Sequence, residues 1–242
     1  MAEHWLIIGA AGGIAQGLIQ QLLAEGHRVS AISRQAARAP QPQLSWYQSA
    51  TPADNGAEVS PELTAVLQQV FSQGVTAVVL CQGWLHGAGM LPEKSLKQLT
   101  RQSLQQSLEV NLFSVAFYLQ ALLPWLQKQP GIKVAVLSAK VGSISDNRLG
   151  GWYSYRMAKA ALNMLVKCSS IELGRFNKSA VLFSLHPGTT DSPLSAPFQQ
   201  NLPAGQLKTP ADTAGYLLAT IRAVSEAETG LLVNWDGKVL AF

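Results

Sequence analysis

A tyrosine and a lysine stand four positions apart in the segment WYSYRMAKAAL, residues 152–162. The alanines, methionine and leucine around them favour a helix, and positions i and i+4 of a helix share one face, with Cβ atoms about 5–6 Å apart. Tyr155 and Lys159 would then be close enough for an ammonium group to act on a phenol. A neighbouring positive charge favours the phenolate and lowers the pKa of a tyrosine, which is about 10 when free. The pair could therefore act as a general acid–base, if the fold places it in a site.

A turn of small residues near the N-terminus could hold a phosphate-bearing ligand. Residues 4–10, HWLIIGA, predict a buried strand, and residues 13–26 predict a helix. Where the strand and the helix meet, the chain has Gly9, Gly12 and Gly13, followed by Ile14. Such a turn lets backbone N–H groups approach a pyrophosphate, while the helix N-terminus offers it partial positive charge. The spacing differs from G-x-G-x-x-G and from the ATP-binding loop, but its place after the first strand favours dinucleotide binding over a plain strand–helix turn.

Short apolar runs alternate with helical patterns along the rest of the chain. Because βαβα alternation produces a parallel sheet covered by helices, we expect a single-domain α/β Rossmann fold over residues 1–242, with a doubly wound parallel sheet of about seven strands and helices on both faces. The segment 189–209, rich in Pro, Ser and Gln, is either a substrate lid or a surface loop. Further strands are expected at 27–34, 43–48, 75–83, 132–139, 179–188 and 231–237, and further helices at 61–74, 95–128 with a break at Pro124, 152–174 and 209–225.

The end of the second strand indicates which dinucleotide is bound. An acidic side chain there would hold the 2′-hydroxyl of NAD, but the strand ends in Ser33 and Arg34. A hydroxyl and a guanidinium suit a 2′-phosphate, so NADP is favoured and NAD is the alternative. Arg34 could instead be a solvated surface charge.

Composition excludes several other classes of protein. The formal net charge is only +4 and there is no run of Lys and Arg, so we expect no nucleic-acid partner. No stretch of about 18 apolar residues predicts a membrane span. The two cysteines lack metal or disulfide spacing, so we expect a cytoplasmic protein without a metal site.

Together, these features resemble the short-chain dehydrogenase/reductase family over the full length of the chain. The resemblance rests on the glycine turn, VNLF at 110–113, a serine at 138 after the fifth main strand, the Tyr155/Lys159 pair and HPGTTDS at 186–192. Within the family the chain is most similar to the carbonyl-reductase-like branch that includes the bacterial cell-contact signalling factors.

The resemblance implies an NAD(P)-dependent reductase that transfers hydride to the carbonyl of a small, largely apolar substrate. Tyr155 would be the acid–base, and Lys159 would assist it and bind the nicotinamide ribose. Asn111 would hold a water of the proton relay, or else only bend its helix around a side-chain hydrogen bond. Contacts to the cofactor are further implied for Gly83, Pro187, Gly188, Thr190 and Ser192.

Three departures from the family pattern bear on activity. Leu80-Cys81-Gln82-Gly83 stands where the family has Asn-Asn-Ala-Gly, so a polar brace of the sheet is missing and Gln82 is expected to replace part of it. Ile8 replaces a threonine of the first strand. Ala139 stands where the family has the serine that polarises the carbonyl. Ser138 is our candidate to replace it, although in a strand it would face the other way, and Ser143 is its competitor.

Trp84 and Trp152 are expected to line an apolar substrate pocket, with packing in the core as the alternative. A cofactor-binding sensor or signalling protein with weak or incidental catalysis is the second functional hypothesis; Ala139 motivates it, and the Tyr155/Lys159 pair opposes it. A homodimer or homotetramer is expected because the helices at 95–128 and 152–174 carry apolar residues on more than one face, namely Leu112, Val115, Leu119, Leu122, Leu162, Leu165 and Val166.

Overall fold

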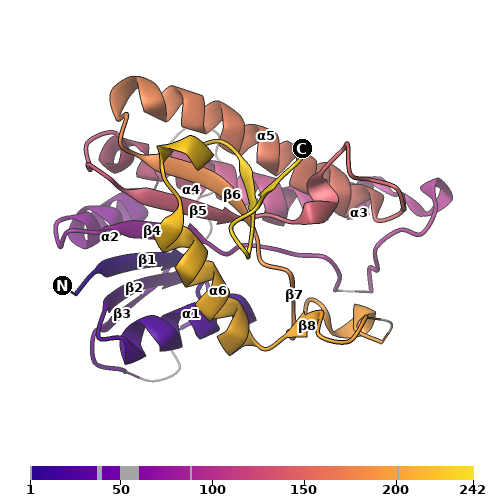
Figure 1. Ribbon diagram of the computed structural model, residues 1–242, viewed down its shortest axis with the longest axis horizontal. Coiled ribbons are helices and arrows are strands. Elements are labelled where there is room, and N and C mark those ends of the chain that lie inside the picture. Colours follow the sequence, from indigo (N-terminus) through magenta and orange to yellow (C-terminus); the bar gives the residue numbers. More distant parts are fainter. Residues whose placement is uncertain (1, 37–39, 50–59, 88, 201) are drawn as a thin grey trace.

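Eight strands form the central sheet, in the order β10-β9-β6-β5-β4-β1-β2-β3. The computed structural model describes residues 2–36, 40–49, 60–87, 89–200 and 202–242 (Figure 1). Seven strands are parallel, as the sequence predicts, and the short β10 pairs antiparallel with β9. The predicted α/β fold is confirmed. The strands of this sheet are β1 (His4–Ile8), β2 (Arg28–Ser33), β3 (Leu44–Gln48), β4 (Ala77–Leu80), β5 (Lys133–Leu137), β6 (Val181–His186), β9 (Leu232–Asn234) and β10 (Val239–Leu240).

Helices cover both faces of the sheet (Figure 1). Helices α1 (Gly13–Ala24) and α6 (Pro210–Ala223) pack on one face, and α2 (Pro61–Phe71), α4 (Ser114–Leu126) and α5 (Tyr153–Phe176) pack on the other. Successive residues of a strand pack on opposite faces of the sheet. In β5, Val134 and Val136 face the α4 side, whereas Ala135 and Leu137 face the α1 side. This is why the strands read as continuous apolar runs.

The long helical pattern at 95–128 is interrupted, but not at the predicted place. After the short 3-10 helix η1 (Leu96–Gln98), α3 (Arg101–Leu108) leads through a π-helical turn, η2 (Glu109–Phe113), into α4. Pro124 lies inside α4, so the predicted break there is wrong. By length and composition the run Arg101–Leu126 could cross a membrane, a test that core helices also pass. Its residues Leu119 and Leu122 are buried against the sheet.

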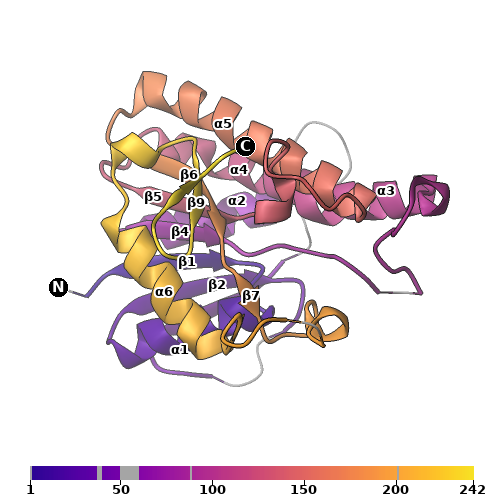
Figure 2. The ribbon, with the colours of Figure 1, turned by 45° about the vertical axis from the view of Figure 1, so that its right-hand side comes forward.

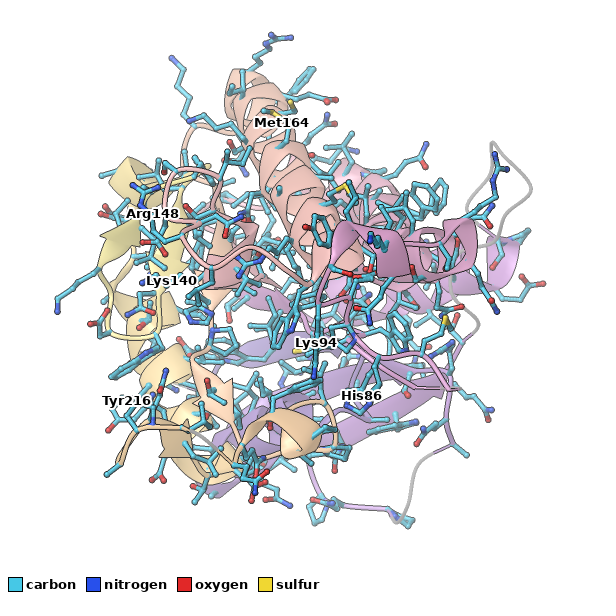
Figure 3. All side chains as sticks on the ribbon, turned by 90° about the vertical axis from the view of Figure 1, so that its right-hand side faces the viewer. His86, Lys94, Lys140, Arg148, Met164 and Tyr216 are labelled. Carbon is cyan, nitrogen blue, oxygen red and sulfur yellow. The ribbon has the colours of Figure 1, made fainter. Side chains whose placement is uncertain are left out.

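The apolar residues on which the expected oligomer was based mostly lie in the core. Five of the seven are buried and two are partly buried against the same cluster: Val115, Leu119, Leu122, Leu162, Val166, then Leu112 and Leu165. They form no free face, so that reasoning is wrong. Other large apolar side chains are exposed on α5, including Met157, Ile171 and Met164, which Figure 3 labels at the outer surface. Oligomerisation remains a prediction.

The carboxyl ends of the parallel strands meet at one edge of the sheet, where ligands bind in such folds. Helix α3 and the segment after β6 project from the same side of the molecule (Figures 1 and 2). That segment contains β7 (Thr189–Thr190), η4 (Ala196–Phe198) and β8 (Leu207–Lys208), and β7 pairs with β8. The predicted segment 189–209 therefore contains short strands and a 3-10 helix beside this edge of the sheet. Residue 201 lies outside the described residues. The remaining 3-10 helices are η3 (Lys140–Gly142) and η5 (Glu226–Glu228).

Candidate active site

A cavity of about 440 Å³ opens at the carboxyl ends of the strands and contains both Tyr155 and Lys159. The predicted helix is present as α5, and the pair lies in its first two turns. The cavity wall comes from the start of α1, the segments after β4, β5 and β6, and α5. Most of the side chains in this wall are apolar, including Leu85, Ala139, Val141, Trp152, Leu194 and Phe198.

Burial sets the protonation of the Tyr155/Lys159 pair. The Lys159 Nζ lies 5.9 Å from the centre of the Tyr155 ring and donates a hydrogen bond to the Leu137 carbonyl at 3.0 Å. Burial lowers the pKa of Lys159 to about 7 and raises the pKa of the Tyr155 phenol. Loss of hydration therefore dominates the pKa of the phenol in this structure, and the lowering of that pKa by Lys159 remains a prediction.

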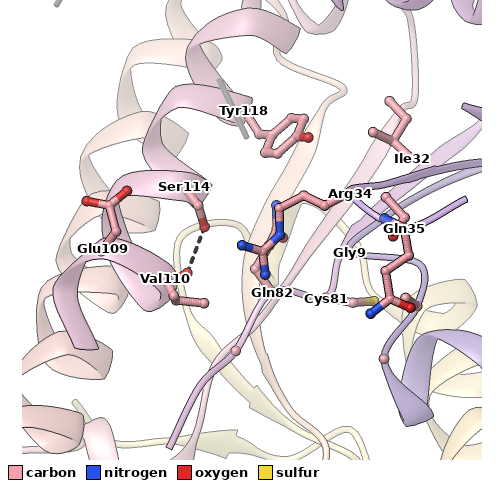
Figure 4. Close-up of a pocket in the computed structure, with 14 residues that line it drawn as sticks. Gly9, Ile32, Arg34, Gln35, Cys81, Gln82, Glu109, Val110, Ser114 and Tyr118 are labelled. Atoms are coloured by element: carbon pink, nitrogen blue, oxygen red, sulfur yellow. Dashed lines mark hydrogen bonds between the residues drawn. The ribbon is translucent and has the colours of Figure 1, made fainter. Parts of the chain in front are cut away.

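A second cavity of about 300 Å³ shares Ala11, Gly12, Cys81, Gln82 and Gly83 with the first. Gly9 adopts φ +78°, and a Cβ there would lie 3.1 Å from the backbone of Cys81, so only glycine fits. Arg34 reaches across this cavity between Tyr118 and Gln82 (Figure 4), and Ser33 also lines it. The glycine turn and the end of β2 thus meet at one site, as the sequence predicts.

The segment after β6 brings the remaining predicted cofactor residues to the first cavity. Pro187, Gly188, Thr190 and Ser192 all line it, together with Gly13 and Ile14 of α1. The buried hydroxyl of Thr190 is hydrogen-bonded to Thr213 at 2.9 Å, which fixes β7 against α6. Every residue predicted to bind the cofactor therefore lines one of two adjoining cavities. Their binding roles remain predictions.

Asn111 is fully buried in the π-helical turn η2 and lines neither cavity. Its Oδ1 accepts the Trp84 N–H at 3.0 Å, and its Nδ2 donates to the carbonyls of Trp84 and Ser107 at 2.8 and 2.9 Å. The side chain ties the segment after β4 to the distorted helix, in line with the alternative of a helix bent by a side-chain hydrogen bond. A part in a proton relay remains a prediction.

A methyl group, not a hydroxyl, lies beside Tyr155 after β5. Ala139 packs with Tyr155 and Leu85 in a small apolar cluster. The Ser138 residue also borders the cavity, but its hydroxyl donates to Asn163 Oδ1 at 2.7 Å. Ser143 lines neither cavity, and its Oγ accepts the Asp146 N–H at 3.2 Å. The geometry therefore gives Ser143 no access to substrate, and a catalytic role for Ser138 stays a prediction.

Two further expectations about this region are wrong. Trp84 does not line the substrate cavity, whereas the next residue, Leu85, does, because neighbouring side chains of an extended chain point opposite ways. Trp152 does line it, with its ring 5.0 Å from that of Phe198. The carboxamide atoms of Gln82 are buried without a hydrogen-bond partner among the described residues, so Gln82 does not brace the sheet.

Sequence reasoning missed residues that reach the site from distant segments. Leu194 and Phe198 come from the segment after β6, and His86 holds that segment by hydrogen bonds from Nε2 to the Pro193 and Leu194 carbonyls at 3.0 and 3.1 Å. His186 also lines the cavity; burial, aided by nearby lysines, lowers its pKa to about 4 and keeps it neutral at physiological pH. Its place in the HPG motif was the available signal. The described residues contain no group of three or more side chains suited to a metal ion.

Comparisons with known proteins agree with this geometry. A family model described as short chain dehydrogenase matches residues 3–203. The 1-hydroxy-2-glutathionyl-2-methyl-3-butene dehydrogenase of Rhodococcus sp. strain AD45 is 27% identical over 239 residues, covering 97% of each chain. C-signal of Myxococcus xanthus is 33% identical over 117 residues, which are 48% of this chain and 65% of that protein. The crystal structure of NADPH-bound carbonyl reductase from chicken fatty liver superposes with a TM-score of 0.78 at 25% identity, covering 100% of this chain and 99% of that one.

Proposed function

This chain belongs to the short-chain dehydrogenase family, and from that premise we propose that it is an NADPH-dependent reductase of carbonyl groups on small, largely apolar molecules. It is an oxidoreductase that acts on CH–OH or C=O groups. The observation that carries the finer proposal is the apolar cavity around Tyr155 and Lys159, which shares five lining residues with the cavity formed by the glycine turn and Arg34.

Tyr155 is proposed as the acid that protonates the carbonyl oxygen. Its raised pKa keeps the phenol protonated at neutral pH, which suits a proton donor in the direction of reduction. Lys159, with a pKa of about 7, can exchange a proton near neutrality and is proposed to reload the phenol. When bound, the nicotinamide cofactor supplies the hydride.

The residues that would hold the cofactor fit an extended dinucleotide. Gly9, at positive φ, lets the turn pack closely against the Cys81 backbone, and the start of α1 offers its N–H groups to phosphates. The buried carboxamide of Gln82 offers an unused donor and acceptor at the junction of the two cavities. The Arg34 guanidinium suits a 2′-phosphate, and the chicken carbonyl reductase is described with NADPH, so NADPH is favoured over NADH.

The purified protein tests the proposal directly. NADPH oxidation is measured with a panel of aldehydes, quinones and diketones, for the wild type and for Tyr155→Phe. We expect kcat to fall by at least about 100-fold in the variant, as for loss of a general acid, while NADPH still binds. Tyr153, the first residue of the same helix, lies outside both cavities. Tyr153→Phe is therefore the matched control and should keep full activity. Unchanged turnover in Tyr155→Phe would contradict the mechanism.

A sensor or signalling protein with the same fold is the second candidate. The methyl group of Ala139 beside Tyr155 favours it, since carbonyl activation loses one donor, and the similarity to C-signal is compatible with it. Binding of NADPH without turnover across the whole panel would support this candidate over the reductase.

The proposal includes a homodimer or homotetramer in the reducing cytoplasm. Exposed Met157, Met164 and Ile171 on α5 support an interface between copies, and the unpaired Cys81 and Cys168 suit a reducing compartment. Light scattering that shows only a monomer at micromolar concentration would contradict the oligomer.

A further inference from the structure

Glu93 is a buried carboxylate that the proposed chemistry does not use. It is 3% exposed, and its carboxylate accepts three hydrogen bonds. Its Oε1 accepts the Ser103 hydroxyl at 2.7 Å, and its Oε2 accepts both the N–H and the hydroxyl of Ser154 at 3.1 Å. Burial alone would raise the pKa of Glu93, but these bonds hold it below the ordinary value. In the part of the chain that the structure describes, no cation forms an ion pair with it.

The start of α5 has no cap of its own. Its N-cap residue is Trp152, which adopts φ +50° and makes no side-chain capping bond, and the first turn contains no acidic residue. Helix starts usually satisfy their free N–H groups with a local Ser, Thr, Asp or Asn. Here Glu93, remote in sequence, accepts the Ser154 N–H with its side chain, and its backbone carbonyl accepts the Trp152 N–H. The carboxylate also complements the positive end of the helix dipole.

Ser154 connects this carboxylate to a longer buried network. The Ser154 carbonyl accepts the Ser107 hydroxyl at 3.1 Å, and the Ser107 carbonyl accepts Asn111 Nδ2 at 2.9 Å. Asn111 in turn binds the Trp84 backbone. The network therefore fixes the first turn of α5 relative to α3, the turn η2 and the segment after β4.

We propose that Glu93 is a positioning residue for Tyr155, acting through Ser154 in the first turn of α5; the inference rests on the proposed reductase function. Ser154 directly precedes Tyr155, so a carboxylate that fixes the Ser154 backbone also fixes where the phenol enters the cavity. A displacement of about 1 Å at a reacting group can lower the rate about 100-fold. A purely structural role would instead change stability and leave the turnover of the folded enzyme intact.

Steady-state kinetics of Glu93→Gln and Glu93→Ala separate these roles. We expect kcat to fall about tenfold in Glu93→Gln, which keeps one acceptor oxygen, and about 100-fold in Glu93→Ala, with both KM values within about twofold of wild type. The partial rescue by glutamine over alanine is the signature of positioning. Glu228→Gln is the matched control, because Glu228 also accepts the N–H and hydroxyl of a serine, Ser225, but at a 3-10 helix outside both cavities. Its kcat should not change.

The position of the phenol gives a second readout that needs no activity. In a crystal structure of Glu93→Gln we expect the Tyr155 Oη to move by more than about 0.5 Å relative to Ala139. A kcat within twofold of wild type in Glu93→Gln, or an unmoved Tyr155, would overturn the inference. If Glu93→Ala does not fold, the glutamine variant decides alone. A wild type that reduces no carbonyl would refute the proposed function, whereas the displacement of Tyr155 would still decide the role of Glu93.

Discussion

Replacing Ala139 with serine should convert weak activation of the carbonyl into strong activation. Ala139 has extended backbone, with φ −151° and ψ 144°, and packs beside Tyr155 and Leu85 at the cavity wall. Serine adds one oxygen to the same Cβ, and the cavity of about 440 Å³ has room for it. The new hydroxyl can therefore donate to a carbonyl oxygen next to the Tyr155 phenol without a change in the backbone.

The size of the gain follows from the worth of one such donor. Removal of a single donor from an oxyanion site typically lowers kcat by about 10²–10³, or about 2.7–4 kcal/mol. An added serine must choose one of three staggered χ1 rotamers, which reduces the gain by up to a factor of about three. We therefore expect kcat to rise about 30- to 300-fold. The rise should be larger for an unactivated ketone than for a diketone, whose carbonyls need less polarisation.

Kinetics of Ala139→Ser with both substrates, beside two serine controls, tests this reasoning. Ser143→Ala should leave kcat unchanged, because Ser143 lines neither cavity. Ser138→Ala removes the donor to Asn163 and should lower the free energy of unfolding by about 1–3 kcal/mol. A folded Ala139→Ser with unchanged kcat, or a tenfold loss in Ser143→Ala, would refute the assignment of the missing donor.

Three further predictions concern the cofactor, the buried lysine and the packing behind it. Arg34→Ala should raise the KM for NADPH about 10- to 100-fold and leave that for NADH unchanged; equal losses would contradict a 2′-phosphate site. The pKa of Lys159 is about 7 in the folded protein and about 10.4 in the unfolded chain. Between these pH values only the unfolded chain binds the proton, so the free energy of unfolding should rise with pH from 7 to 10. The free energy of unfolding of Lys159→Met, measured with urea, should lack this rise. Equal pH slopes for the variant and the wild type would contradict the prediction. In Gly142→Ala the new Cβ would lie 2.8 Å from the Lys159 backbone, so activity should fall at least tenfold. The control Gly174→Ala, whose new Cβ would have nothing within 4 Å, should be active. Full activity in Gly142→Ala would refute the packing argument.

The sequence pattern of short apolar runs between helical segments predicted the seven parallel strands, because strands buried on both faces appear as continuous apolar runs. It could not predict β10, since the two residues Val239–Leu240 carry no period. The turn η2 was also beyond it. Asn111 binds the Trp84 backbone, 27 positions away, and a local sequence pattern cannot predict a contact between residues so far apart. Pro124 predicted a break, but it lies two residues before the end of α4 and the helix continues through it.

The two halves of the candidate site differed in how well the sequence predicted them. The residues predicted to bind the cofactor, such as Gly9 and Gly188, lie at strand ends, and a parallel sheet brings strand ends to one edge, so topology alone gathers them. The substrate half depends on the direction of side chains in irregular segments. Leu85 rather than Trp84, and Phe198 from the segment after β6, reach the cavity through turns that propensity does not specify.

The burial of Lys159 argues for catalysis more strongly than Ala139 argues against it. Its ammonium is taken out of water with a backbone carbonyl as its hydrogen-bond partner, and its pKa falls to about 7. Binding a nucleotide needs only a permanent charge, which we propose that Arg34 supplies, so a sensor would gain nothing from a lysine that loses its proton near neutrality. A proton donor for a phenol needs that property. We therefore expect the methyl group of Ala139 to limit the rate of the proposed reduction, and the pair of Tyr155 and Lys159 to determine the kind of reaction.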